Sequence, residues 1–105
     1  MRRGEVWWAN VPLPTGRRPV VLLSRDAAYD VRTSLTVAPI TTRAFGIRSE
    51  VPLGPEDGLP QQCVANLDSI ATIDREWLDG YITLLSPEKI AAVDKAIHFA
   101  LALRD

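Results

Sequence analysis

Short apolar stretches, many of them rich in β-branched residues, alternate with breaks that contain proline and glycine along most of the chain. Runs of this length and composition are typical of β-strands. The breaks, such as Pro12-Leu13-Pro14-Thr15-Gly16, predict tight connections between the strands. Five or six short strands at this spacing predict a mostly β fold with α, built on a small antiparallel barrel. The expected strands cover residues 5–11, 19–23, 35–40, 50–53, 62–67 and 81–84.

A helix is expected after the last strand. Ser86-Pro87-Glu88 combines a hydroxyl at the N-cap, a proline at the first helical position and an acid in the first turn, and the helix is expected to reach about Leu103. Its apolar residues form two stripes on roughly opposite sides. The first stripe is Ile90, Val93, Ile97 and Leu101, and the second is Ala92, Ala96, Phe99 and Leu103. We predict that the first stripe packs on the barrel and that the second meets another copy in a homodimer, because Phe99 would otherwise stand in water. The alternative is a helix buried more deeply in its own fold.

Length and composition fit a single domain over residues 1–105. A chain of 105 residues with 47% hydrophobic residues can build one modest core. The lone Cys63 excludes an intramolecular disulfide framework and a cysteine-based zinc site. No apolar run approaches the ~18 residues that a membrane span needs, and residues 1–5 lack the apolar stretch of a signal peptide. A cytoplasmic protein without membrane contact is expected.

Charge is divided unevenly along the chain, although the formal net charge is only -1. Residues 1–50 carry eight arginines and four acids, a balance of +4, whereas residues 51–105 carry four basic residues and nine acids, a balance of -5. The first half is therefore the candidate anion-binding half. All its basic residues are arginines, which suit bidentate phosphate contacts and stacking on bases. A solvated basic face is the alternative.

Most common catalytic arrangements are missing. His98 is the only histidine and lies on the flank of the predicted helix near Asp94, so one chain cannot supply a histidine pair, and we interpret His98 as structural. There is no phosphate-binding glycine loop, no HExxH motif and no pair of carboxylates near a histidine, so neither a metal nor a cofactor is expected. Asp74 is better explained as the N-cap of a short turn at 75–78 than as a ligand.

Two strand ends remain as candidate sites. Arg17-Arg18-Pro19 enters one buried strand, and Ile40-Thr41-Thr42 leaves another. Strand ends let a rigid scaffold hold polar groups over a substrate. Adjacent side chains diverge in an extended segment, so only one of the two arginines can easily face the site. Pro19 restricts the backbone of Arg18 to extended geometry, which helps to fix its direction.

Five motifs appear in a characteristic order and spacing: Arg3-Gly4-Glu5-Val6-Trp7-Trp8, Arg18-Pro19-Val20-Val21, Val37-Ala38-Pro39-Ile40-Thr41, Ile70-Ala71-Thr72-Ile73-Asp74-Arg75 and Leu85-Ser86-Pro87-Glu88. Over nearly the whole chain the sequence resembles the MazF/PemK (Kid) endoribonuclease toxins. The resemblance implies an SH3-like barrel of the plasmid-toxin type with a C-terminal helix, assembled as a homodimer. It also implies cleavage of single-stranded RNA at short sequences, inhibition of translation and growth, and inactivation by a cognate MazE-like antitoxin.

Carried over by position, the resemblance implies that Arg18 and Thr41 are catalytic and that Asp68 occupies an acidic position near the scissile phosphate. Attack by a ribose 2′-OH on the adjacent phosphate needs no metal if a cation stabilises the developing charge and other groups move the protons. The products would be a 2′,3′-cyclic phosphate and a 5′-hydroxyl. Arg18 suits charge stabilisation and is a candidate proton donor, but its pKa above about 12 makes it a poor base. Asp68 is a candidate base, and the base otherwise stays unassigned.

The sequence departs from the family around the predicted RNA contacts. The loop before Arg18 is short, Ser69 and Ala71 stand where glutamine and arginine are common, and Asn66 replaces an arginine found in one branch. We therefore do not expect the recognition sequence to carry over. Charge and base stacking make the interleaved residues after Thr41 plausible RNA contacts, with an ordinary mobile loop as the alternative. The predicted RNA-binding residues are Arg17, Thr42, Arg43, Phe45, Arg48, Asn66 and Ser69.

Two other functions stay open on sequence. A DNA-gyrase poison like the CcdB toxins would share the fold and act by binding a protein, and fold alone cannot separate the two classes. A catalytically inactive barrel that only binds a partner is the third possibility. The Arg18-Pro19 and Ile40-Thr41 motifs favour the ribonuclease.

Overall fold

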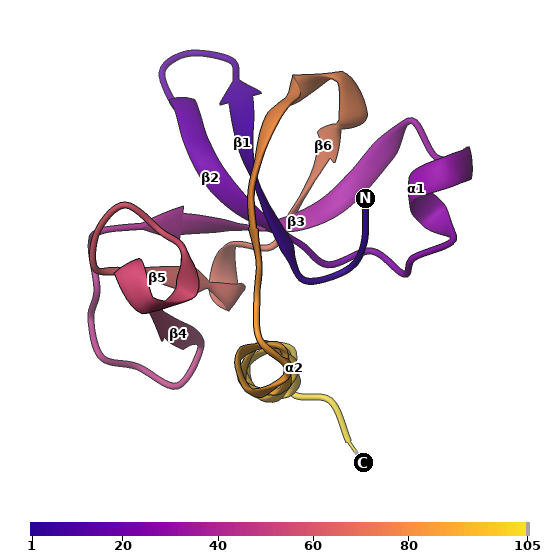
Figure 1. Cartoon of the computed structure of the whole chain (residues 1–105). Coiled ribbons are helices and arrows are strands. Elements are labelled where there is room, and N and C mark those ends of the chain that lie inside the picture. The colour runs from indigo at the N-terminus through magenta and orange to yellow at the C-terminus, as the bar shows by residue number, and fades with distance from the viewer. Residues whose placement is uncertain (105) are drawn as a thin grey trace.

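Strands dominate the computed structural model, which describes residues 1–104 (Figure 1). They are β1 (Glu5–Val11), β2 (Gly16–Leu22), β3 (Ser34–Thr41), β4 (Glu50–Leu53), β5 (Cys63–Asn66), β6 (Ala71–Asp74) and β7 (Leu78–Leu84). Two α-helices, α1 (Ala28–Val31) and α2 (Pro87–Ala100), and three short 3₁₀ helices, η1 (Pro55–Asp57), η2 (Leu67–Ser69) and η3 (Arg75–Trp77), complete the elements of these residues.

The sheet is antiparallel at every pairing, in the order β4-β5-β3-β2-β1-β7. β3 is the central strand: its first half pairs with β6, its middle with β2, and its last two residues with β5. Among residues 1–104 no pairing joins β4 to β7, so the strands form an open barrel. The prediction of a mostly β antiparallel fold with a C-terminal helix is confirmed.

Three strand assignments differ from the sequence prediction. β6 was not expected, because three of its four residues are exposed and the segment is short; pairing with the first half of β3 makes it a strand. β7 begins at Leu78, and Gly80, which favours a break, lies inside it with φ +135. β2 begins at Gly16, because its first residues pair with β1 although they are not buried.

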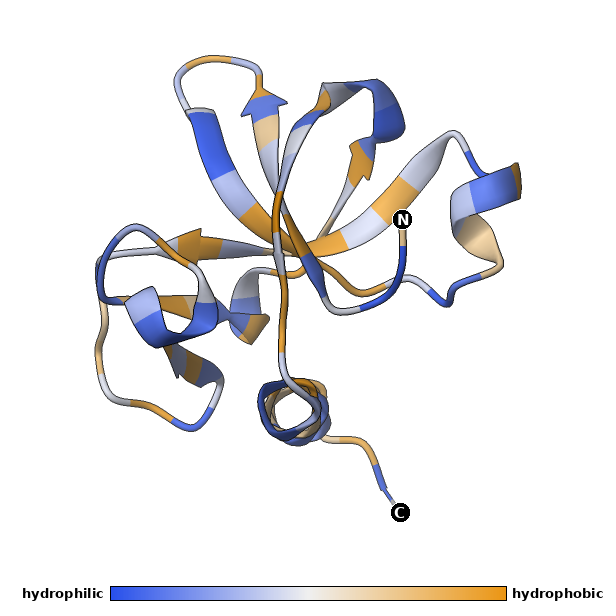
Figure 2. Cartoon of the chain, viewed as in Figure 1, coloured by the Kyte–Doolittle hydropathy of each residue, from blue (hydrophilic) through white to orange (hydrophobic). Residues whose placement is uncertain are grey.

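The core has two parts, one on each face of the central strands. Val21 lies in the first cluster with residues of β5, η2 and α2, whereas its neighbours Val20 and Leu22 lie in the second with Tyr29. Alternate residues of a strand point to opposite faces, so β2 is apolar without interruption where both faces are covered. In Figure 2 the hydrophobic segments of β2 and β3 meet at the centre of the sheet.

Helix α2 starts as predicted and ends earlier. The Ser86 side chain accepts a hydrogen bond from the Lys89 backbone N–H at 3.2 Å, which confirms the N-cap. The last helical residue is Ala100, and the chain turns at Ala102 instead of continuing to Leu103.

The division of α2 into two stripes is partly wrong. Ala96, assigned to the outward stripe, is buried in the same cluster as Val93, and Ala92 packs against that cluster. Leu101, assigned to the inward stripe, is 55% exposed. The error arises because the helix lies deep enough to bury small residues on its flanks, and because its end at Ala100 leaves Leu101 beyond the core. Phe99 and Leu103 are exposed, as predicted.

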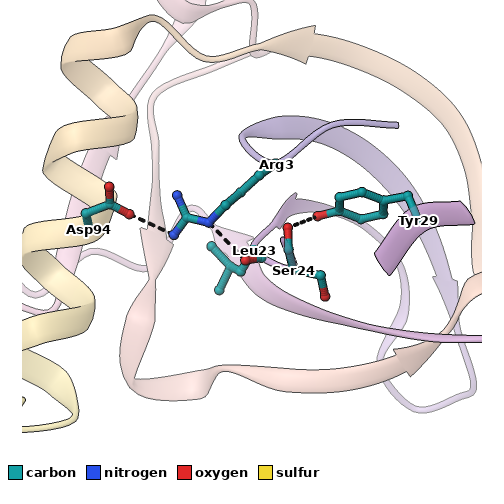
Figure 3. Close-up of polar contacts among 5 residues, drawn as sticks. All are labelled: Arg3, Leu23, Ser24, Tyr29 and Asp94. Atoms are coloured by element: carbon teal, nitrogen blue, oxygen red, sulfur yellow. Dashed lines mark hydrogen bonds and ion pairs between the residues drawn. The ribbon is translucent and has the colours of Figure 1, made fainter. Parts of the chain in front are cut away.

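Polar contacts tie the N-terminus to α2 and to the sheet (Figure 3). An Arg3 terminal nitrogen lies 2.7 Å from Asp94 Oδ1, and Arg3 Nε donates to the Leu23 carbonyl at 3.0 Å. The buried Tyr29 hydroxyl donates to the Ser24 carbonyl at 2.8 Å, and burial raises the pKa of Tyr29 to about 12. Within residues 1–104, no helix has the length and apolar character needed to cross a membrane.

Candidate functional site

Arg18 and Thr41 meet where β2 and β3 leave the core. The β2–β3 ladder pairs Leu22 with Val37, Val21 with Ala38 and Val20 with Pro39. The same register extended by two residues sets Arg18 opposite Thr41, which puts both side chains on one face of the sheet. Pro19 has no N–H to donate at this point, which is consistent with the end of the ladder. Both residues are half-buried, and both line the same two cavities.

The first cavity, here called the Trp8 cavity, has a volume of about 180 Å³. It lies between the strand ends and the segment that precedes β5. Its lining combines apolar side chains with arginine, hydroxyl and amide groups. The lining residues are Trp8, Arg17, Arg18, Pro19, Ile40, Thr41, Thr42, Leu59, Pro60, Gln61 and Cys63.

The second cavity, here called the Phe45 cavity, has a volume of about 390 Å³ and lies on the other side of Arg18 and Thr41. It is more polar, and its walls come from β3, from the loop that follows β3 and from the residues around η2. The lining residues are Arg18, Pro39, Thr41, Arg43, Phe45, Asn66 and Ser69.

Arg18 presents a donor that its own fold leaves unused. Its Nε is buried and has no hydrogen-bond partner among residues 1–104. Because Arg18 is half-buried and lines both cavities, its guanidinium offers charge-assisted donors there, for which an anionic oxygen is the strongest acceptor. Thr41 Oγ1 accepts a hydrogen bond from the Arg43 backbone N–H at 3.2 Å, and its own hydroxyl hydrogen can still be donated. The junction of the two cavities is therefore built to bind an anion.

Arg17 is held at the wall of the Trp8 cavity. Its guanidinium carbon lies 4.5 Å from the centre of the Trp8 ring, and its Nε lies 3.5 Å from Asp79 Oδ2. The Asn10 side-chain amide donates to the same Asp79 oxygen at 2.9 Å. Stacking and an ion pair thus restrain the Arg17 side chain, which is half-exposed, and leave its outer face open to a ligand.

Cys63 lies at the Trp8 cavity but is poorly suited to act as a nucleophile. Burial, with smaller contributions from Asp57 and Glu56, raises the pKa of the Cys63 thiol. The thiolate is the reactive form, so little of it is present near neutral pH. Residues 1–104 contain no group of three or more histidine, cysteine, aspartate or glutamate residues placed to hold a metal ion.

The structure brings together most of the residues that the sequence singled out. Arg17 and Thr42 join Arg18 and Thr41 around the Trp8 cavity. Four more predicted residues, from two separate segments, lie with Arg18 and Thr41 around the Phe45 cavity. They are Arg43, Phe45, Asn66 and Ser69.

Two of the predicted site residues lie elsewhere. Asp68 lines neither cavity, and its carboxylate accepts a hydrogen bond from the buried Ser49 hydroxyl. Arg48 turns to α2, where its guanidinium carbon lies 4.4 Å from the centre of the Phe99 ring. Asp68 and Arg48 each have a partner in the fold that sequence spacing could not reveal, and their assignment to the site stays a prediction.

Sequence reasoning missed the far wall of the Trp8 cavity, formed by Trp8, Leu59, Pro60, Gln61 and Cys63. Residues 59–61 looked only like part of a break between strands. Their position depends on how η1 and β5 fold back over the strand ends, and no local pattern encodes that contact. The Trp8 indole gave a weak signal as an aromatic residue next to a core position of β1.

The fold and the site together define a class of protein. It is a small open β-barrel with a C-terminal helix, which offers a strand-end arginine and flanking aromatic and polar groups to an anionic polymer. Phosphates separated by bases fit this arrangement better than a compact anion would, because the anion site has a cavity on each side.

Comparison with known proteins gives the family. Residues 2–101 match the model of the PemK-like, MazF-like toxins of type II toxin-antitoxin systems, and this chain belongs to that family. Probable endoribonuclease MazF5 of Mycobacterium tuberculosis is 40% identical over 100 residues, which cover 94% of this chain and 91% of the relative. The match favours the RNA-cleaving class over a gyrase poison.

Solved structures agree with this assignment. Toxin MazF-mt6 of Mycobacterium tuberculosis superposes with a TM-score of 0.89 at 33% identity, over 96% of this chain and 99% of that one. A mycobacterial endoribonuclease solved in complex with its cognate antitoxin superposes with a TM-score of 0.87 at 27% identity, over 100% of this chain and 98% of that one.

Proposed function

We propose that this protein is a cytoplasmic toxin that cuts single-stranded RNA without a metal and is held inactive by a cognate antitoxin. The names of its relatives support the class of activity. The single observation that carries the proposal is that Arg18 and Thr41 both line the same two cavities, so that a guanidinium and a hydroxyl face the place where the cavities adjoin. A scissile phosphate at that junction would lie against the Arg18 guanidinium and leave one neighbouring nucleotide in each cavity.

The chemistry follows from the groups at the junction. The ribose 2′-oxygen attacks phosphorus, a new P–O2′ bond forms, and the P–O5′ bond breaks to leave a 2′,3′-cyclic phosphate and a 5′-hydroxyl. Negative charge grows on the non-bridging oxygens during attack, and Arg18 is positioned to stabilise it. Thr41 donates its hydroxyl hydrogen to the phosphate and restrains its orientation.

The cleavage reaction also requires two proton transfers. The 2′-hydroxyl must lose its proton to a base, and the leaving 5′-oxygen must gain one. Arg18 can supply the second, but a guanidinium with pKa above about 12 is a poor acceptor for the first. We assign no step to Asp68, because its carboxylate is engaged by Ser49 outside both cavities.

The two cavities offer different surroundings to the bases on either side of the phosphate. In the Phe45 cavity, the Phe45 side chain is 70% exposed and can stack on a base, while Arg43, Asn66 and Ser69 offer hydrogen bonds. In the Trp8 cavity, the restrained Arg17 guanidinium presents a flat face for stacking, beside the Gln61 amide.

The partners follow from the family and from the exposed apolar surface. One solved relative is described with its cognate antitoxin, which supports a MazE-like antitoxin as the partner here. We propose a homodimer in which the exposed end of α2 lies at or near the interface. The apolar residues at this end are Phe99 in α2 and Leu101 and Leu103 just beyond it, which are 47%, 55% and 50% exposed.

The experiment incubates the purified protein with mixed cellular RNA in EDTA and sequences the new 5′-hydroxyl ends. Arg18→Ala should lower kcat by about 10²–10³-fold, the typical loss for one transition-state donor, and Thr41→Ala should lower it less. Arg25→Ala is the matched control, since Arg25 is exposed and lines neither cavity. RNA left intact by the wild type, cleavage that requires a divalent metal, or full activity of Arg18→Ala would overturn the proposal.

A further inference from the structure

We infer that Glu50 is a positioning residue that holds the segment 42–48, here called the 42–48 loop, over the Phe45 cavity and thereby sets how tightly RNA binds. The inference rests on the proposed function. Glu50 begins β4, lines neither of the two site cavities, and is not among the residues that the sequence indicated.

The Glu50 carboxylate is bound by three successive backbone N–H groups of the loop. Oε1 accepts from Phe45 at 3.0 Å, from Gly46 at 2.9 Å and from Ile47 at 3.5 Å, and Oε2 accepts a second contact from Phe45 at 3.2 Å. Glu50 is only 8% exposed. A carboxylate this deep is costly unless it is hydrogen-bonded, so these contacts compensate its burial and order the loop at the same time.

Little else holds the middle of this loop. Residues 42–48 are all exposed, and residues 43–47 belong to no helix or strand. Behind the loop lies a cavity of about 430 Å³, lined on the loop side by Thr42, Ala44, Gly46 and Ile47 and on the sheet side by residues that include Glu50. Apolar packing therefore cannot fix the loop from behind.

The ends of the loop are anchored separately. At the start, the Arg43 N–H donates to Thr41 Oγ1, and at the end Arg48 lies over the Phe99 ring. Between these anchors the Glu50 carboxylate binds the N–H groups of Phe45 and Gly46, and near the end of the loop the Ile47 carbonyl accepts from the Glu50 backbone N–H at 3.0 Å. The loop carries Arg43 and Phe45, both walls of the Phe45 cavity, so their placement depends on Glu50 although it reaches neither the cavity nor the reacting phosphate.

The substitution Glu50→Gln tests whether the carboxylate orders the loop through its hydrogen bonds or the side chain only fills space. Glu50→Gln preserves the shape of the side chain but replaces one acceptor oxygen by an NH₂ group, which cannot accept the Phe45 N–H and weakens the array. The loop should loosen while the sheet stays folded. We expect KM for a short single-stranded RNA substrate to rise about tenfold, with kcat within about twofold of wild type, because Arg18 and Thr41 are undisturbed.

The decisive experiment is a double-mutant cycle of Glu50→Gln with Phe45→Ala on that substrate. If Glu50 acts through the loop, each single variant raises KM, and the double variant is little worse than either, because the misplaced Phe45 no longer contributes. The control cycle pairs Glu50→Gln with Arg17→Ala in the other cavity, where the two effects on KM should multiply. Multiplicative effects in both cycles, or an unchanged KM for Glu50→Gln, would overturn the inference.

Two further measurements test the inference if Glu50→Gln proves too unstable to assay. Gly46 has φ +71 and no atom within 4 Å of a Cβ built on it, so Gly46→Ala strains the loop backbone without touching the core and should raise KM similarly. Unchanged KM in a folded Gly46→Ala protein would count against the inference.

Amide hydrogen exchange measured without RNA separates the inference from the proposed function. Phe45, Gly46 and Ile47 should be protected in the wild type and exchange faster in Glu50→Gln. If the wild type cuts no RNA, the proposed function fails and with it the effect on binding, whereas these amides still report whether Glu50 orders the loop. Unprotected amides in the wild type would overturn the inference even if RNA is cut.

Discussion

Ser49 and Glu50 are both buried polar residues, and they are neighbours in the chain. Their side chains bind different segments: the Ser49 hydroxyl donates to Asp68 in η2, and the Glu50 carboxylate accepts from the 42–48 loop. Arg43 and Phe45 in the loop, and Asn66 and Ser69 around η2, line the Phe45 cavity. One pair of residues at the start of β4 thus anchors both sides of that cavity to the sheet.

The role of Asp68 can be tested at the level of this single residue. Asp68→Asn should keep the RNA cleavage rate within a few-fold of wild type, because the Asp68 carboxylate lies outside both cavities. It should reduce the free energy of unfolding by about 1 kcal/mol, through a weaker hydrogen bond with Ser49. Single-turnover cleavage and urea unfolding measure the two effects. A drop in rate as large as that of Arg18→Ala would instead make Asp68 the general base.

Burial of Tyr29 predicts that the stability of the protein falls at alkaline pH. Its pKa rises from 10.0 to about 12 through burial, so above pH 10 the unfolded state releases the phenol proton while the folded state keeps it. This contribution to stability is complete below pH 10 and is lost as the pH rises through 12, a change of about 2–3 kcal/mol.

Tyr29→Phe isolates this effect, since it removes the titration together with the hydrogen bond to the Ser24 carbonyl. At pH 8 the variant should be less stable than wild type by about 1 kcal/mol, and by pH 12 it should be the more stable protein. Urea unfolding of both proteins at each pH gives the comparison. A stability difference that does not vary with pH would contradict the burial of Tyr29 as the cause.

Among the elements, α2 ends in a way that the pattern of apolar residues does not indicate. The Leu103 N–H donates to the His98 carbonyl at 3.0 Å, and the Ala102 N–H donates to the Phe99 carbonyl at 3.2 Å. Ala102 has φ 54, the left-handed conformation that this helix ending requires and that normally favours glycine. With no glycine to mark the stop, the sequence predicts a helix that continues to Leu103.

This ending predicts a stabilising substitution. Ala102→Gly should raise the free energy of unfolding by about 0.5–1 kcal/mol, because glycine adopts the left-handed conformation without steric cost. The matched control is Ala91→Gly at an exposed position in the interior of the helix, which should lower stability by about 1 kcal/mol. Thermal unfolding of the two variants should shift in opposite directions, and shifts of the same sign would contradict this description of the helix end.

Element identity was predictable where burial imposes a strong pattern. β1, β3 and β4, and the start of α2, lie within one residue of their predicted bounds, because strand burial and the Ser86-Pro87 cap are local properties. β6 and the first residues of β7 were missed, because Ala71, Thr72 and Asp74 are exposed and Gly80 resembles a break. These segments are strands only because β3 and β1 lie beside them.

At the scale of the whole molecule, the net charge is only -1, although the first half of the chain has an excess of arginine. Folding gathers Arg17, Arg18 and Arg43 around the two site cavities, while Arg3 pairs with Asp94 and Arg48 lies over Phe99. RNA affinity should therefore depend on a few arginines and not on the overall charge.

Salt dependence tests this statement. With three phosphate contacts, the slope of log K against log salt for a non-cleavable 2′-O-methyl RNA should be about -2, and Arg43→Ala should reduce its magnitude by about 0.7. Arg25→Ala should leave the slope unchanged, because Arg25 is exposed and lines neither cavity. Fluorescence anisotropy at several salt concentrations provides the slopes. Equal effects of the two substitutions would show that binding follows overall charge.

By itself, the sequence determined the class of fold and the family, and it predicted a site at the strand ends around Arg18 and Thr41, since alternation, capping and motif order are all local properties of the chain. Only the tertiary structure decided which polar residues share a cavity. It joined Asn66 and Ser69 to Phe45, turned Asp68 to Ser49 and Arg48 to Phe99, and buried Glu50 behind the loop. These choices depend on contacts between segments far apart in the chain, and the energy of such a contact exists only once both segments have folded.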